Sequence, residues 1–199
     1  MICPWLKYTT SIEQPTHQNI ISVGQFAIVH KVNPKIVRKV PSDKSDIYSV
    51  QAFEIEAKIY GHLGRHRRIA RCIRCADDYI ALRCETNGNL ETYLRENPSS
   101  DALRHRLARQ AVEAVVYIHK KRVIHSDLAA RQFLVDRNRN IRLSDFGGSS
   151  LNGSDAIAME NATHFLPRDE EVQILYKAIY LPWVQPSMKY LSAGNLTME

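Results

Sequence analysis

Two aspartates flank a pair of short apolar runs in the second half of the chain, and their side chains could serve phosphate chemistry. The stretch VIHSDLAARQFLVDRNRNIRLSDFGG, residues 123–148, places Asp127 just before the first run and Asp145 just after the second. The runs FLV and IRL have strand character, and the polar turn DRNRN between them predicts a hairpin. Such a hairpin would bring the two carboxylates close together, which suits a metal ligand and a group that orients a hydroxyl.

The elements that must position these aspartates can be read from the hydrophobic periodicity. Residues 19–41 are β-branched and alternating, which predicts two or three antiparallel strands. Residues 49–64 switch to helical spacing with Gly64 as the predicted stop, and residues 68–85 return to strand character. Residues 101–122 carry apolar side chains at steps of three and four, which predicts a long amphipathic helix. We therefore expect a small sheet with one helix, followed by a mainly helical region.

Composition places the chain among ordinary globular proteins of one domain. It has 199 residues, of which 44% are hydrophobic and 24% charged. These values exclude wholesale disorder and fibrous repeats. The N-terminus has no signal-peptide pattern, and no run approaches the length of a membrane span. We expect no membrane partner and a cytoplasmic or nuclear location.

The net charge of +6 raises the question of a nucleic-acid partner. The basic residues are scattered, with one cluster at residues 64–74, GRHRRIARCIR. No aromatic side chains interleave this cluster, so a solvated basic rim is the better interpretation. We expect no nucleic acid among the partners, and the cluster is the only support for an RNA phosphotransferase.

Four cysteines, Cys3, Cys72, Cys75 and Cys84, include a single C-x-x-C motif. No second pair or H-x-x-x-H completes a zinc site. The segment around Cys72 has strand character, and residues three apart in a strand point to opposite faces. We expect packing thiols in a reducing compartment, without shared metal binding.

The order of the motifs resembles the eukaryotic protein kinase domain and, more loosely, a group of small fungal protein kinases. HSDLAARQ, residues 125–132, resembles the catalytic loop, and SDFGG, residues 144–148, resembles the magnesium motif. The resemblance implies an α+β fold with two lobes, and ATP and Mg²⁺ as cofactors. It implies that Asp127 orients the acceptor hydroxyl and that Asp145 chelates Mg²⁺.

The same resemblance assigns two charged residues upstream. Lys39 in IVRKV stands where the strand lysine of the family contacts phosphates, and Glu56 in FEIEAKIY matches its helical partner. Glu54 is the competing candidate. Glu56 is preferred because Ile59 lies three residues after it at a core position.

The nucleotide-covering loop SVGQFAIV keeps Gly24 and Val29 of the family pattern, which implies that both contact the nucleotide. Ser22 and Ala27 stand where glycines are expected, so close backbone approach to phosphate is harder. By its offset from the NGNL motif, Glu85 would offer hinge backbone to the adenine.

Two departures affect the catalytic loop. Ser126 replaces the arginine that binds a phosphorylated activation loop in many kinases, so this mode of control should be absent. Gln132 replaces the asparagine that serves as second metal ligand. It has the same amide on a side chain one methylene longer, so Asp145 and Gln132 are the expected Mg²⁺ ligands.

The resemblance divides the chain into a kinase-like domain at residues 18–169 and a tail at residues 170–199. The first lobe would span about residues 18–85, and an incomplete second lobe residues 86–169. Near its end, Pro167 is followed by Arg168 where the family has glutamate. The tail matches nothing in a kinase, although its codon junctions in a neighbouring frame permit a string resembling the central helix of the lower lobe. A frame-shifted reading and a genuine tail therefore both stay open.

Three functions are consistent with this pattern. The first is an ATP-dependent protein kinase, with serine or threonine favoured as acceptor. The second is an inactive pseudokinase or truncated module that binds nucleotide or a partner. The third is a phosphotransferase acting on RNA or a small molecule. The sequence predicts neither the substrate nor the oligomeric state.

Overall fold

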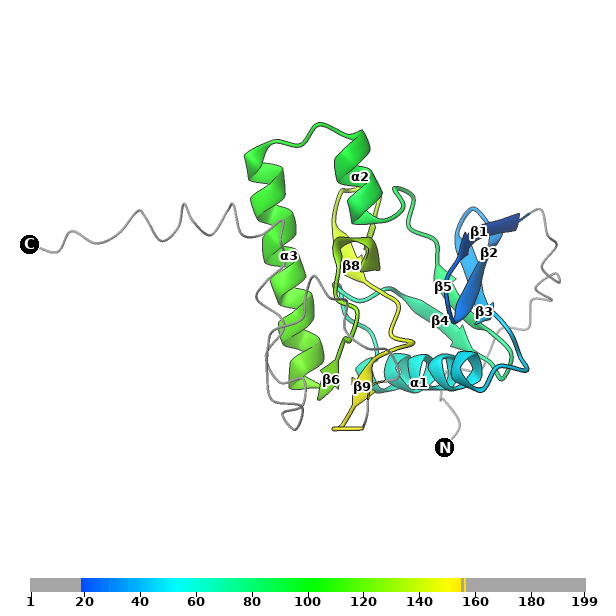
Figure 1. The fold of residues 1–199 in the computed structure, drawn as a ribbon. Helices are drawn as coiled ribbons and strands as arrows, with labels where there is room; N and C mark the ends of the chain where they lie inside the picture. The colour runs from blue at the N-terminus through cyan, green and yellow to red at the C-terminus, as the bar shows by residue number, and fades with distance from the viewer. Residues whose placement is uncertain (1–18, 155, 157–199) are drawn as a thin grey trace, which may run out of the picture.

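The computed structural model describes residues 19–154 and residue 156, which form a sheet-containing part and a more helical part (Figure 1). The first part is built on a five-stranded sheet with the strand order β1-β2-β3-β5-β4, and every neighbouring pair is antiparallel. Its strands are β1 (Ile20–Val23), β2 (Ala27–Asn33), β3 (Ile36–Pro41), β4 (Cys72–Cys75) and β5 (Ile80–Arg83).

Helix α1 (Ile47–Leu63) connects β3 to the later strands and packs against β3. It begins at Asp46, whose carboxylate accepts hydrogen bonds from the backbone N–H groups of Tyr48 and Ser49. It ends at Gly64, which has φ 65°, a conformation that favours glycine. Both ends therefore follow local sequence rules, and Gly64 is the predicted stop.

The second part contains α2 (Leu90–Glu96), α3 (Asp101–Lys120) and several short strands. β7 (Phe133–Val135) and β8 (Ile141–Leu143) form the predicted antiparallel hairpin, and β6 (Val123–Ile124) pairs with β9 (Ser150–Leu151). One turn of 3₁₀ helix, η2 (Ala130–Gln132), leads into β7. In Figure 1, α3 runs along one side of this part, and β6 and β9 lie between its lower end and α1.

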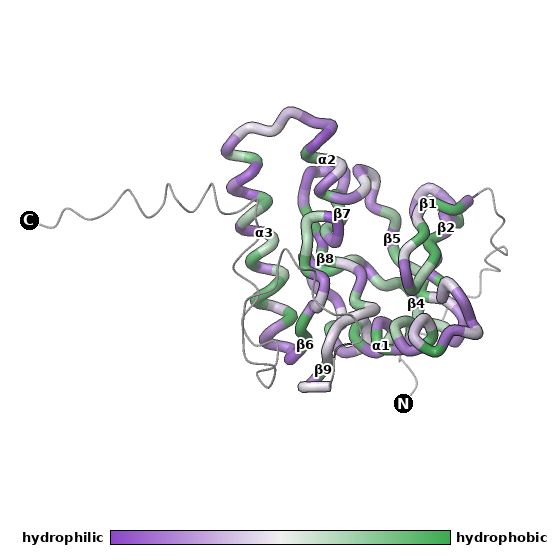
Figure 2. The backbone as a smooth tube through the Cα atoms, in the orientation of Figure 1, coloured by the Kyte–Doolittle hydropathy of each residue, from purple (hydrophilic) through white to green (hydrophobic). Residues whose placement is uncertain are grey.

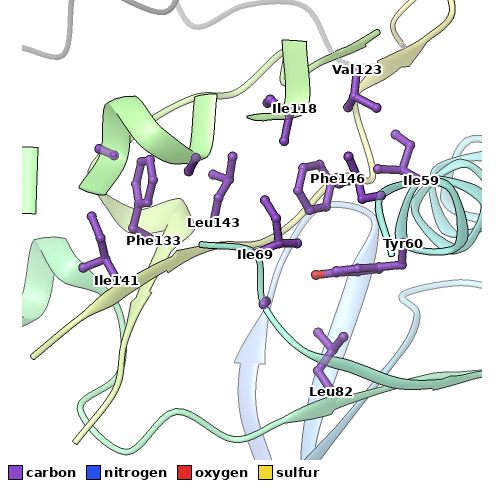
Figure 3. Close-up of a cluster of buried hydrophobic side chains, with 14 of the residues drawn as sticks. Ile59, Tyr60, Ile69, Leu82, Ile118, Val123, Phe133, Ile141, Leu143 and Phe146 are labelled. Carbon is purple, nitrogen blue, oxygen red and sulfur yellow. The ribbon is translucent and has the colours of Figure 1, made fainter. Parts of the chain in front are cut away.

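A continuous hydrophobic core joins the two parts (Figure 3). It includes Tyr60 from α1, Leu82 from β5, Ile118 from α3, and Phe133 and Leu143 from the hairpin. In Figure 2, hydrophobic and hydrophilic segments alternate along α3, as its amphipathic spacing predicts. The α+β class and the two-part architecture predicted from the sequence are confirmed.

The expectation that Cys72 and Cys75 point to opposite faces is wrong. Their sulfurs lie 3.4 Å apart. The register explains why: Cys72 pairs with Leu82 and Arg74 with Ala81, so β4 advances two residues while β5 advances one. This irregularity adds a residue to the strand and breaks the simple alternation of faces.

The predicted tail at residues 170–199, and the Pro167-Arg168 pair before it, lie outside the described residues. Among the residues that are described, no helix has the length and apolar character that a membrane crossing requires.

Candidate active site

The site is centred on Lys39, a buried lysine in the middle of β3. Its Nζ lies 2.6 Å from Glu56 Oε2 and 2.5 Å from Asp145 Oδ1. Glu56 comes from the buried face of α1, and its side chain is 1% exposed. Glu54, the competing candidate, is exposed and pairs with Lys58 along the helix. The sheet, α1 and the segment after β8 thus meet at one ammonium group.

Asp145 lies directly after the hairpin in a conformation that few residues adopt. Its φ is 64°, within the left-handed region that aspartate tolerates better than most residues. The side chain is 48% exposed, whereas Glu56 is buried. Strained backbone of this kind is concentrated at functional sites. The conformation leaves one carboxylate beside Lys39 and partly open to solvent.

Charge and burial oppose each other in this cluster. Burial alone would lower the pKa of Lys39, but the Glu56 and Asp145 carboxylates outweigh it, and the pKa lies above its usual value. Burial raises the pKa of Glu56, and Lys39 counteracts the rise. For Asp145, burial is outweighed by the charge of Lys39 and its hydrogen bond, so the pKa lies below its usual value. The Asp145 carboxyl is therefore ionised at neutral pH.

Phe146 holds the segment after Asp145 in the core. Its ring meets Tyr60 edge-on at a centroid distance of 5.3 Å, and it lies 5.3 Å from the ring of His125. Its backbone N–H donates to Glu56 Oε1 at 3.4 Å. Glu56 thus contacts Lys39 with one oxygen and the Asp145-Phe146 segment with the other. The position of α1 and that of Asp145 are coupled through this carboxylate.

Asp127 occupies the turn before η2, and both of its carboxylate oxygens have partners. Arg131 forms an ion pair with Oδ1, and Gln132 Nε2 donates to Oδ2 at 2.5 Å. Asp127 is half-buried and Gln132 is buried. The carboxylate that the resemblance assigns to the acceptor hydroxyl is therefore fixed by two side chains of its own loop.

A short chain of hydrogen bonds links Asp127 to Asp145. The carbonyl oxygen of Gln132 accepts hydrogen bonds from Ser144 N at 2.9 Å and from Ser144 Oγ at 2.8 Å. His125 Nε2 lies 3.0 Å from the carbonyl oxygen of Ser144. Burial lowers the pKa of His125, so the imidazole is neutral and acts as a structural link. Gln132 and Ser144, at the two ends of the β7–β8 hairpin, thus fix the positions of Asp127 and Asp145 relative to each other.

The predicted nucleotide-loop residues lie in β2 and in the turn that leads into it. Gly24 is in the turn between β1 and β2, where its N–H donates to the Ala27 carbonyl oxygen at 2.8 Å. A Cβ at Gly24 would lie 3.4 Å from that oxygen, an ordinary contact. Val29 lies directly opposite Lys39 in the β2–β3 pair. The structure therefore places Val29 beside the lysine, and Gly24 at the tip of the neighbouring β1–β2 hairpin.

Glu85 lies in the connection between the two parts, and backbone hydrogen bonds fix the chain on each side of it. Cys84 N–H donates to the Lys35 carbonyl oxygen at 2.8 Å, and Asn87 N–H donates to that of Val135 at 3.1 Å. The Glu85 side chain is 3% exposed, and its Oε1 lies 3.0 Å from Arg142 Nε. The two atoms form an ion pair, but their orientation does not satisfy the geometry of a hydrogen bond. Burial raises the pKa of Glu85, and Arg142 opposes the rise. The side chain thus belongs to a structural ion pair, and the backbone is the part left for a ligand.

Three contacts were not predicted from the sequence. Ser126 Oγ donates to the Gly148 carbonyl oxygen at 2.7 Å, tying the Asp127 turn to the end of the SDFGG motif. The other two are the Arg131 pair with Asp127 and the Arg142 pair with Glu85. Asp127 and Arg131 lie four residues apart in a turn and a 3₁₀ helix, where the spacing rule for α-helices gives no signal for the first pair. The second joins positions distant in sequence, for which no local signal exists.

The donor set is compatible with Mg²⁺ but not with a cage made only of protein. Within residues 19–154 and 156, no group of three or more His, Cys, Asp or Glu side chains could hold a metal ion. Mg²⁺ normally keeps several waters and shares one or two carboxylates with substrate phosphates. Asp145 offers an ionised, half-exposed carboxylate, and the Nε2 of Gln132 points its hydrogen bond at Asp127, leaving its amide oxygen as a donor.

Comparison with known proteins agrees with this geometry. A sequence model of the family described as protein tyrosine and serine/threonine kinase matches residues 16–167. The chain belongs to the protein kinase family. The match covers the sheet, α1, the Asp127 turn and the Asp145 hairpin, so the kinase fold extends across the described residues.

The relatives include both a tyrosine-protein kinase and a serine/threonine-protein kinase. The chain is 28% identical to a probable receptor-like protein kinase of Arabidopsis thaliana, over 71% of this chain and 32% of the relative. It is 33% identical to the tyrosine-protein kinase transforming protein Abl of Abelson murine leukemia virus, over 61% and 17%. It is 32% identical to an Aurora kinase of Candida glabrata, over 48% and 24%. The chain therefore spans a third or less of these relatives.

Proposed function

We propose that this chain acts as an ATP-dependent protein kinase domain that phosphorylates a protein hydroxyl, with serine or threonine as the acceptor. The observation that carries the proposal is the buried Lys39 ammonium, held between Glu56 at 2.6 Å and Asp145 at 2.5 Å. A buried charge of this kind is costly to maintain. A lysine fixed beside a half-exposed carboxylate suits the binding of nucleotide phosphates.

Each residue has a role in this proposal. Gly24, Val29 and the Glu85 backbone would contact the nucleotide, and Lys39, aligned by Glu56, would contact its phosphates. Asp145 and Gln132 would hold Mg²⁺, which when bound neutralises charge on the phosphates. Asp127 would orient the acceptor hydroxyl and accept its proton.

In the transfer itself, the acceptor oxygen bonds to the γ-phosphorus as the bond to the bridging oxygen breaks, and ADP leaves. Asp127 needs a free carboxylate oxygen for its part in this step. Because Arg131 and Gln132 contact its two oxygens, one of these contacts must be exchanged or shared when the acceptor binds.

Those contacts favour a second candidate, a pseudokinase that binds nucleotide without transfer. Arg131 and Gln132 occupy both oxygens of the Asp127 carboxylate, which the acceptor hydroxyl would need. The occupied carboxylate would weaken catalysis more than nucleotide binding, whereas Ser22 and Ala27, which replace glycines in the nucleotide loop, would weaken binding as well.

The test is transfer of labelled γ-phosphate from ATP to a panel of protein acceptors, followed by acid hydrolysis to identify the phosphorylated amino acid. The proposal predicts Mg²⁺-dependent phosphoserine or phosphothreonine. Phosphotyrosine would overturn the acceptor assignment and leave the kinase activity intact. ATP binding without any transfer would select the pseudokinase.

Three further points are proposals of the same kind. The lobe boundary is placed near residue 85, where the chain passes from β5 to α2. Residues 170–199 are proposed to lie outside the kinase fold. A cytoplasmic or nuclear location is proposed as well.

A further inference from the structure

The C-x-x-C motif of β4 forms a close thiol pair at the outer edge of the sheet. Cys72 Sγ and Cys75 Sγ lie 3.4 Å apart, within contact distance for two thiols. Both residues are half-buried, so a small solute can reach them. The register shift in β4 places the two side chains together, as described above. β4 is an edge strand, so β5 is its only neighbour within the sheet.

We propose that Cys72 and Cys75 form a redox-active dithiol that a hydroperoxide converts to an intramolecular disulfide. In the first step the Cys75 thiolate attacks the peroxide oxygen, the O–O bond breaks, and Cys75 becomes a sulfenic acid as hydroxide leaves. In the second step the Cys72 sulfur attacks the Cys75 sulfur, the S–O bond breaks, and water leaves with the Cys72 proton. The two sulfurs lose two electrons in total, and the peroxide gains them.

The geometry favours a disulfide over the alternatives. A disulfide bond is about 2.05 Å long, so the sulfurs must approach by roughly 1.4 Å. Rotation of two side chains and a small shift of an edge strand can supply this movement. A metal site needs more ligands, and no third His, Cys, Asp or Glu within residues 19–154 and 156 joins the pair.

Cys75 is the better nucleophile of the two. The hydrogen bond with Cys72 lowers the pKa of the Cys75 thiol, against the effects of burial and of Glu56, which raise it. A thiol with a lowered pKa has more thiolate at neutral pH, and thiolate is the form that attacks peroxide.

The dithiol is connected to the lysine of the site by two short routes. Cys75 pairs with Ile80 across β4 and β5, and Ile80 pairs with Lys39 across β5 and β3. Cys75 Sγ also lies 3.9 Å from the Ala57 carbonyl oxygen, next to Glu56 on α1. Disulfide formation removes the S–H that faces the Ala57 carbonyl oxygen. It also displaces Cys75, the outermost of the three paired residues Cys75, Ile80 and Lys39. If the proposed kinase function holds, oxidation should lower phosphate transfer reversibly, and this consequence rests on that function.

The test of the dithiol needs no kinase activity. The full chain is treated with hydrogen peroxide, remaining thiols are alkylated, and the product is digested with trypsin, which cleaves after Arg71, Arg74 and Arg83. In the reduced protein, peptides 72–74 and 75–83 separate. The proposal predicts that after oxidation they run as one linked species lacking two hydrogens, and that dithiothreitol separates them again.

Variants assign the chemistry to individual sulfurs. Cys84→Ser is the matched control and should leave the 72–75 linkage unchanged. In Cys72→Ser the sulfenic acid at Cys75 has lost its partner, so a dione reagent should trap it there, whereas Cys75→Ser should give slower labelling at Cys72.

Three outcomes would overturn the proposal. They are linkage of Cys75 to Cys3 or Cys84, linkage between two chains, and full alkylation of both thiols after peroxide. An intact linkage without any change in phosphate transfer would leave the dithiol in place and remove only its effect on the kinase site.

Discussion

At the scale of single residues, Lys39 joins two carboxylates that differ in burial, and the difference decides what each contributes. Glu56 is 1% exposed and depends on Lys39 for compensation of its charge, whereas Asp145 is 48% exposed and can be solvated. Removing one partner of a buried ion pair costs more than the pair itself contributes, because the other charge is left unpaired. Glu56 is therefore the more costly carboxylate to leave without Lys39.

Lys39→Met should lower the free energy of unfolding by about 3 kcal/mol, because it leaves the buried Glu56 carboxylate unpaired. Adding Glu56→Gln should recover part of this loss, since the amide carries no charge. Glu54→Gln on the exposed face of α1 is the matched control and should recover none. Urea denaturation of the single and double variants measures both effects. Strictly additive costs would show that Glu56 does not depend on Lys39.

The lowered pKa of Asp145 predicts a pH dependence with a defined sign. A carboxyl whose folded pKa lies below its unfolded value stabilises the fold above the unfolded pKa, and this stabilisation is lost as pH falls through the folded pKa. Asp145→Asn removes the titration and keeps a residue that tolerates positive φ. The stability difference between wild type and Asp145→Asn should be largest near neutral pH and shrink in acid. A difference that is constant with pH would contradict the assigned shift.

Helix α1 places Glu56 against the sheet, where it contacts Lys39. The glycines within the helix and at its end, Gly61 and Gly64, have opposite effects on its stability. Gly64 ends the helix with φ 65° and ψ −153°, a conformation that side chains disfavour. Gly61 lies within the helix, is exposed, and has nothing within 4 Å of a Cβ. One glycine is needed for its conformation, and the other only weakens the helix.

Gly64→Ala should therefore destabilise the protein by roughly 1–2 kcal/mol, and Gly61→Ala should stabilise it by up to about 1 kcal/mol. Because the substitutions are chemically the same and three residues apart, each is the control for the other. Thermal unfolding followed by circular dichroism measures both. The same sign for the two substitutions would contradict the described end of α1.

At the scale of the whole molecule, Arg142 ties the hairpin to the connection between the two parts. Its guanidinium lies 3.0 Å from Glu85 and 3.5 Å from Asp136, and it donates to the Arg67 carbonyl oxygen at 2.8 Å. The Glu85 side chain is almost fully buried, so it depends on this arginine for its charge compensation. The orientation of the two parts should depend on this cluster.

Arg142→Gln should lower the free energy of unfolding by about 2 kcal/mol near neutral pH. The cost should be smaller in mild acid, because Glu85 already has a raised pKa and is protonated first as pH falls. Arg137→Gln, an exposed arginine in the hairpin turn, is the control and should have little effect. Denaturant unfolding of wild type and both variants, near neutral pH and in mild acid, measures the cost of each substitution at each pH. An equal cost at both would show that Glu85 is not the group left unpaired.

Local patterns in the sequence were sufficient for much of this fold. The period of α3, the stop at Gly64 and the turn DRNRN act over a few residues, and the structure forms the corresponding helices and hairpin. Lys39 and Glu56 were matched through the resemblance to protein kinases, and their side chains lie 2.6 Å apart. The close pair of Cys72 and Cys75 was missed because a shift in strand register depends on the partner strand. The Arg142 pair with Glu85 was missed for a related reason, since it joins segments distant in the sequence.

In the proposed function, Asp127 serves the transfer step while Lys39 contacts the nucleotide phosphates. These roles are tested by measuring ATP binding and γ-phosphate transfer on the same preparations of wild type, Asp127→Ala and Lys39→Met. We expect Asp127→Ala to bind ATP as wild type does but to transfer phosphate ~100-fold more slowly or worse, and Lys39→Met to lose ATP affinity together with transfer. Undiminished transfer by Asp127→Ala, with ATP binding intact, would show that Asp127 does not serve the transfer step.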